Sequence, residues 1–178
     1  MSRIHYLAAG AAIIAAAPCY AVTYHTVESA QRACFPDGAD FAPADVKLTK
    51  EQSKAIEKAS GVRVRLDGQR VWKATKKGQY IGWFIIDEVL GKHEYITWAL
   101  ALNADGSVKA IEVMDYRETY GYEIRNADWR VQFVGKKYGA KFKLGDDVKN
   151  VSGATLSCRH ITDGVKRLLS FYELVLKK

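Results

Sequence analysis

The chain has 178 residues, of which 48% are hydrophobic, so it can bury the core of one ordinary globular domain and is too short for two comfortable ones. This composition argues against wholesale disorder. The formal net charge is +7 at pH 7, but the Lys and Arg residues are scattered, with no run typical of a nucleic-acid-binding arm, so we expect no nucleic acid as a partner.

The first residues are typical of a signal peptide. Arg3 provides a positively charged start, residues 7–17 form an apolar run too short to span a bilayer comfortably, and Cys19 and Ala21 place small residues at a plausible cleavage site. We therefore expect residues 1–21 to be removed and the mature protein to be periplasmic or otherwise extracytoplasmic. An uncleaved N-terminal membrane anchor is the alternative.

Two cysteines, Cys34 and Cys158, would remain after cleavage. An oxidising compartment permits a disulfide between them, but no sequence pattern indicates that their side chains meet, so the pairing stays open. Two cysteines are too few for a disulfide scaffold or a structural zinc site. No pair of His, Cys or acidic residues has metal-ligand spacing, and we therefore expect no metal.

Two short helices are predicted in an N-terminal helical segment, residues 22–60. The first covers residues 27–35 and ends at a Pro-Asp-Gly breaker. The second covers residues 51–60. Thr49 begins it as the N-cap of a capping box, and Gly61 follows it as a typical C-terminal glycine.

The hydrophobic period then changes to two, which is typical of half-buried strands. Asp67-Gly68 predicts a tight hairpin, and residues 103–106 predict another. Strands joined by such turns pair antiparallel. The expected strands cover residues 62–66, 70–75, 79–89, 96–102 and 108–116.

The rest of the chain is irregular at first and helical at the end. Residues 117–150 are rich in glycine and charge, with a short helix expected over residues 126–133. An amphipathic helix is predicted over residues 155–176. The predicted fold class is α+β: an antiparallel sheet of about five strands, with N-terminal helices and a long C-terminal helix packed on it.

The segment Ser152-Gly153-Ala154-Thr155 leads directly into the last predicted helix. The first turn of a helix has free backbone N–H groups and the positive end of the helix dipole, so it suits a phosphate. Small residues at 153 and 154 would let a bulky phosphate ester approach the backbone. The alternative is that Ser152 or Thr155 caps the helix and no ligand binds.

Residues 151–157 (VSGATLS) resemble the flavinylation motif of the FMN-binding domain family. That family includes the exported domains of the C subunit of the sodium-pumping NADH:quinone oxidoreductase and of the Rnf complex G subunit. The resemblance implies that residues 61–178 are an FMN-binding domain. It also implies that a dedicated flavin transferase uses FAD to join FMN to Thr155 by a phosphoester. The motif residues expected to bind the cofactor are Ser152, Gly153, Ala154, Thr155 and Leu156.

The resemblance extends upstream of the motif. Residues 118–121 (ETYG) resemble the family's Glu-Thr-Pro-Gly loop, and residues 129–136 resemble the aromatic and Gly-Lys segment that follows it. This loop adds Glu118, Thr119 and Gly121 to the expected cofactor-binding residues.

The sequence departs from the family pattern at two positions. Tyr120 stands where the loop usually has Pro, and Lys149 stands where the larger complexes often have an Asp three residues before the Ser of the motif. Asp146 and Asp147 lie nearby but are shifted. Neither departure removes the acceptor hydroxyl of Thr155.

Other residues are weaker candidates for contact with a flavin. Trp129, Tyr116 and Tyr122 are candidates for stacking against its ring, although the tryptophans of the chain are expected mostly in the core. His93 is a candidate for proton transfer beside the ring, with a surface turn as its alternative. His160 is expected on the polar side of the last helix, solvated or in contact with phosphate.

These observations predict an exported flavoprotein that transfers electrons between membrane or exported redox partner proteins. No catalytic residue can be assigned, which favours an electron-transfer protein over a stand-alone enzyme. One alternative is a flavin-dependent reductase acting on a small substrate. Another is a flavin-free envelope binding protein in which Thr155 only caps a helix.

Overall fold

A computed structural model describes residues 22–65 and 67–177. The expected signal peptide, residues 1–21, lies outside the described residues. The described chain forms an antiparallel sheet with strand order β1-β7-β6-β5-β4-β2, and β3 also pairs with β4. The strands are β1 Val22–Thr23, β2 Asp40–Pro43, β3 Val46–Lys47, β4 Gly68–Lys76, β5 Gln79–Leu90, β6 Tyr95–Asn103 and β7 Val108–Tyr116.

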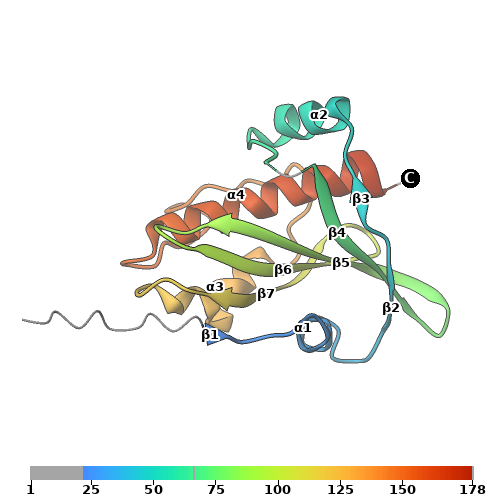
Figure 1. Cartoon of the computed structure of the whole chain (residues 1–178), viewed down its shortest axis with the longest axis horizontal. Coiled ribbons are helices and arrows are strands. Elements are labelled where there is room, and N and C mark those ends of the chain that lie inside the picture. Colours follow the sequence, from blue (N-terminus) through green and yellow to red (C-terminus); the bar gives the residue numbers. More distant parts are fainter. Residues whose placement is uncertain (1–21, 66, 178) are drawn as a thin grey trace, which may run out of the picture.

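Helices cover both faces of this sheet, so the predicted α+β class is confirmed (Figure 1). The closing helix α4 lies along one face and packs against α2, while α1 lies on the opposite face. The α-helices are α1 Val27–Cys34, α2 Lys50–Ser60, α3 Ala127–Arg130 and α4 Thr155–Phe171. Helical turns of other types are η1 Tyr122–Arg125, η2 Val131–Phe133 and the π-helical η3 Tyr172–Leu176, which continues α4.

The long strands have buried side chains on both faces because helices cover both sides. On β5, Ile85 belongs to the hydrophobic cluster under α4, whereas Phe84 and Ile86 belong to the cluster under α1. Successive side chains of a strand point to opposite faces, which explains this alternation. Strands β4 to β7 follow the predicted ranges within a few residues.

The predicted signals at the ends of α2 are confirmed. Thr49 Oγ1 accepts a hydrogen bond from Gln52 N at 3.2 Å, and Gln52 Oε1 accepts one from Thr49 N at 2.9 Å. Gly61 follows the helix with φ of 68°, in the left-handed region that glycine adopts without strain.

The strand expected over residues 62–66 is wrong for its described part, residues 62–65, and the hairpin at Asp67-Gly68 does not form. Strand β4 pairs instead with β2 and β3. Its edge is therefore already occupied by residues from the N-terminal segment. Residues 22–60 thus contribute strands as well as helices and are part of the same sheet.

The sheet separates the two cysteines of the described chain. Cys34 belongs to the cluster under α1 and Cys158 to the cluster under α4, and both thiols are free. Burial raises the pKa of the Cys34 thiol to about 12. The disulfide that the sequence left open does not form.

Gly164 lies inside α4, where a Cβ would come 2.7 Å from Trp98 Cζ2. The glycine therefore lets the helix approach β6 closely, at the expense of helix propensity. Within the described residues, no helix is long and apolar enough to cross a membrane.

Candidate functional site

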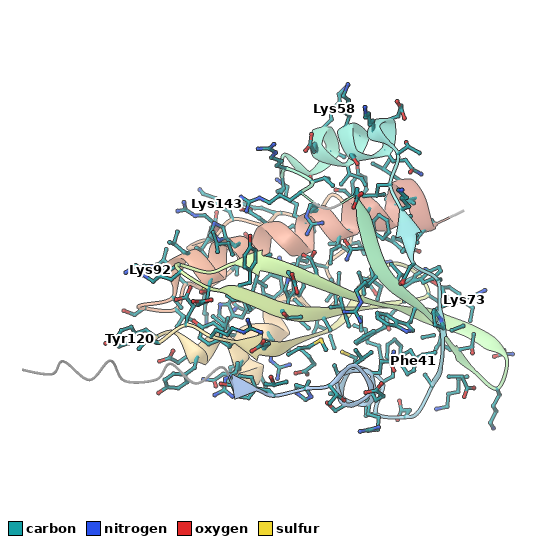
Figure 2. All side chains as sticks on the ribbon, viewed as in Figure 1. Phe41, Lys58, Lys73, Lys92, Tyr120 and Lys143 are labelled. Carbon is teal, nitrogen blue, oxygen red and sulfur yellow. The ribbon has the colours of Figure 1, made fainter. Side chains whose placement is uncertain are left out.

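Loops from different parts of the chain meet where α4 begins. They are the β5–β6 turn at residues 91–94, the loop after β7 at residues 117–121, and the turn at residues 151–154. Figure 2 shows Lys92 and Tyr120 at this end of the sheet. The predicted site residues all lie in the last two of these loops and in the first turn of α4.

Gly121 packs directly against the motif segment. Its φ is +85°, and a Cβ at this position would lie closer than 3.0 Å to the Cβ of Ala154 and 2.9 Å from Tyr116 Oη. A residue with a side chain would therefore be strained and would clash. The two predicted site residues Gly121 and Ala154 can lie this close because glycine has no side chain.

Glu118 joins the loop after β7 to the β5–β6 turn. Its Oε1 accepts hydrogen bonds from His93 N at 2.6 Å and Glu94 N at 3.0 Å. Partial burial raises the pKa of the carboxyl, but hydrogen bonds from the backbone N–H groups of His93, Glu94 and Lys92 outweigh it and leave the pKa below its ordinary value. Glu118 is thus an ionised carboxylate that positions loops.

Tyr116 fixes the shape of the same loop. This buried side chain donates a hydrogen bond from its hydroxyl to the Tyr120 carbonyl at 2.5 Å. Thr119 is exposed, and Tyr120 is 76% exposed. The loop therefore presents Thr119 and Tyr120 to solvent on a backbone that Tyr116 and Glu118 hold in place.

Thr155 is the first residue of α4, and its side chain is exposed. Its Oγ1 accepts a hydrogen bond from Asn150 Nδ2 at 3.0 Å. The N-cap is Ala154, and no side-chain hydrogen bond caps the helix. The alternative in which Ser152 or Thr155 caps α4 is therefore wrong, and the Thr155 hydroxyl keeps its own proton available for donation.

The first turn of α4 fits a phosphate group. Its leading N–H groups have no intrahelical acceptor, and Ala154 has no side-chain oxygen to offer them. Gly153 has φ of +81°, and no heavy atom lies within 4 Å of the position of a Cβ there. Ser152 is exposed and Leu156 is 40% exposed. A ligand can therefore reach this turn and the Thr155 hydroxyl from solvent.

Trp129 is buried, and its Nε1 donates to the Lys149 carbonyl at 2.8 Å. It belongs to the core cluster under α4 and anchors the segment before the motif, so it is not a stacking neighbour for an exposed ligand. Tyr122 remains exposed near the loop. His93 is exposed as well, in the turn that Glu118 holds.

His160, expected to be solvated or to contact phosphate, is only partly accessible to solvent. The residue is half-buried, and its Nδ1 forms a hydrogen bond with the Leu90 carbonyl. The reason is that this side of α4 faces the end of β5, which the helical wheel of one segment does not reveal.

Sequence reasoning missed two contributions to the site. Asn150 contacts the Thr155 hydroxyl across the turn, and Tyr116 fixes the upstream loop. No sequence signal marks the contact of Asn150, because it joins two side chains five residues apart across a turn. The Tyr116 contact depends on how the loop folds back.

The fold and the site together define a ligand-binding α+β domain whose closing helix has an uncapped N-terminus beside an exposed threonine. Residues 91–170 match the FMN-binding domain family. This match agrees with the resemblance of the motifs to that family. The matched range includes all the predicted site residues.

A solved structure supports the fold. The crystal structure of NqrC from Shewanella oneidensis is similar to this chain with a TM-score of 0.51 and 19% sequence identity. The similarity covers 73% of this chain and 66% of that chain, so the chain spans just under two thirds of the length of NqrC. None of the curated proteins compared matches the sequence.

Proposed function

We propose that this protein is an exported flavoprotein that holds FMN covalently through Thr155 and transfers electrons between redox partner proteins. The observation that carries the proposal is the Thr155 hydroxyl, which is exposed at the uncapped start of α4 inside the matched FMN-binding range. A capping threonine would have its oxygen occupied by the helix backbone.

The attachment reaction would transfer the FMN part of FAD to Thr155. A bond forms between Thr155 Oγ1 and the phosphorus of the FMN part of FAD, while the bond joining the two phosphates breaks. AMP leaves, and the hydroxyl proton is released. Asn150 holds Thr155 Oγ1 in place, and the N-terminus of α4 favours the charge of the attached phosphate. A flavin transferase would carry out this step.

The surroundings of Thr155 favour electron transfer to another protein. The side chains exposed near it include Tyr120, Tyr122 and Leu156, which offer an apolar surface suited to docking. Bound FMN supplies the redox chemistry, and the chain supplies attachment and position. The basic charge of the chain would steer an acidic partner toward it.

We expect export because residues 1–21 are typical of a signal peptide, and a covalent link to FMN would suit an exported protein. A flavin bound by a phosphoester stays with the protein in the periplasm, where a diffusible cofactor would be lost. The expected partners are a flavin transferase and membrane or exported redox proteins.

The test is the intact mass of the mature protein after co-expression with an exported flavin transferase. The wild type and Thr23→Ala should carry the added mass of FMN, because Thr23 is an exposed threonine outside the motif and the upstream loop. Thr155→Ala should lack it. Retention of the mass in Thr155→Ala would place the link elsewhere, and its absence from every protein would refute covalent attachment.

A further inference from the structure

A cavity of about 510 Å³ lies beside α4, and its lining does not include Thr155. Its walls are α4, the end of β5, Tyr95 at the start of β6 and the segment of residues 61–65 that joins α2 to β4. This volume falls in the range of small-molecule binding sites. The first α4 residue in its lining is His160, more than one helical turn after Thr155.

Positive side chains with no protein partner line part of this cavity. Arg63 and Arg65 come from the segment after α2, and Lys166 comes from α4. Within residues 22–65 and 67–177, none of the three forms an ion pair or a side-chain hydrogen bond. Their charges are therefore available to a ligand.

The backbone that carries the two arginines is held in place without a strand partner. Val64 N donates to Glu57 Oε1 at 2.9 Å, and Val62 N donates to Ser60 Oγ at 3.1 Å. Val64 packs against the hydrophobic core, while Arg63 and Arg65 are exposed. Val64 therefore anchors the segment to the core, while Arg63 and Arg65 reach the cavity.

Arg167 also lines the cavity, but its charge is already used. It is 8% exposed, and its Nη2 donates to Asp87 Oδ2 at 2.5 Å. Glu88 and Asp163 contribute negative charge to the lining as well. The cavity therefore suits a ligand with a single negative charge better than a dianion.

Apolar side chains form another part of the lining. Val62, Val89 and Leu90 line the cavity together with the ring of Tyr95. A ligand that fills this volume must bury an apolar body there to gain hydrophobic stabilisation. Inorganic phosphate has no such body, although guanidinium groups bind phosphate and carboxylate alike.

We propose that this cavity binds a small organic carboxylate, with its carboxylate on Arg63 and Arg65 and its apolar body against the valine, leucine and tyrosine side chains. The proposal does not depend on the attachment of FMN. It concerns a second, non-covalent site along the middle of α4, between His160 and Arg167.

The test is calorimetric titration of the purified protein with benzoate, its neutral counterpart benzamide, and inorganic phosphate. Benzoate should bind saturably, and benzamide and phosphate should bind roughly tenfold more weakly or not at all, since only benzoate offers both a carboxylate and an apolar body. Binding should be equal in protein with and without FMN.

Variants locate the binding in the cavity. Arg63→Ala/Arg65→Ala should weaken benzoate binding by about tenfold or more, because it removes the charge-assisted hydrogen bonds. The control Arg32→Ala/Lys54→Ala removes the same charge at exposed positions outside the lining and should bind as the wild type does. The melting temperatures of all proteins show whether they are folded.

Three outcomes would overturn the proposal. They are the absence of benzoate binding to folded protein, an equal loss of benzoate binding in both double variants, and phosphate binding as tight as that of benzoate. Loss of benzoate binding on FMN attachment would also overturn it, because the flavin would then occupy the cavity. The mass measurement at Thr155 is separate, so the two proposals can fail independently.

Discussion

Gly121 and Ala154 are in van der Waals contact, although one ends the loop after β7 and the other is the N-cap of α4. A Cβ on Gly121 would lie closer than 3.0 Å to the Cβ of Ala154, a separation that Cβ atoms essentially never show. This contact places the upstream loop beside the segment that carries Thr155.

Gly121→Ala is expected to lower the free energy of unfolding by about 2–3 kcal/mol, because it combines positive-φ strain with a clash. Gly153→Ala is the matched control. It has a similar φ of +81° but open space around the Cβ position, so we expect a loss of only about 1 kcal/mol. Urea denaturation measures both. Equal losses of unfolding free energy in the two variants would show that the clash with Ala154 does not destabilise the protein.

Thr155→Ala is expected to change the stability of the FMN-free protein by less than about 0.5 kcal/mol, because Thr155 is exposed and does not cap α4. Thr49→Ala removes a real capping box and should cost about 1 kcal/mol. Thermal unfolding of the two variants checks this difference. A Thr155→Ala loss as large as that of Thr49→Ala would mean that the hydroxyl stabilises the helix.

Glu118→Gln is expected to destabilise the protein by about 1 kcal/mol at neutral pH, since hydrogen bonds to a charged acceptor are stronger than those to a neutral one. The pKa of Glu118 is lowered in the folded state. Its contribution is therefore present above the unfolded pKa and is lost as the pH falls through the folded pKa. Denaturation at several pH values should show the two proteins converging in acid, and a constant difference would contradict this account.

Arg167→Met is expected to cost about 3–5 kcal/mol, because it leaves the Asp87 carboxylate buried without its partner. The double variant Asp87→Leu/Arg167→Met should recover much of that stability, since no buried charge remains. Chemical denaturation measures the set. A double variant no more stable than Arg167→Met would show that packing, and not the unpaired charge, causes the loss.

The same pair predicts a pH dependence. Burial raises the pKa of Asp87 in the folded state, although Arg167 opposes the shift. The folded protein then binds more protons than the unfolded chain between the two pKa values, so this group lowers stability as the pH rises through that window. Asp87→Asn should remove the decrease. An unchanged pH profile in that variant would assign the decrease to another group.

Much of the fold was predictable because its signals are local. The period of two and the turn residues located strands β4 to β7, and the capping box located α2. The motif at residues 151–157 correctly indicated where α4 begins, and it lies in the range that matches the FMN-binding domain family. Each of these signals depends on residues close to one another in the chain.

Pairing between distant segments was decided only by the tertiary structure. The alternation over residues 62–65 was the same as that of a strand, but β2 and β3 occupy the edge of β4, so that segment lines a cavity instead. The alternation of apolar and polar residues shows which side chains can be buried. It does not show which strand edge is available for pairing.

The sequence by itself determined strands β4 to β7, the helices α1, α2 and α4, the fold class and the threonine that the family motif marks, because these depend on local propensity and on a contiguous motif. The tertiary structure decided that Gly121 meets Ala154, that Glu118 binds the β5–β6 turn and that the sheet separates Cys34 from Cys158. These contacts and separations involve residues that are far apart in the chain. They depend on how the helices pack on both faces of one sheet.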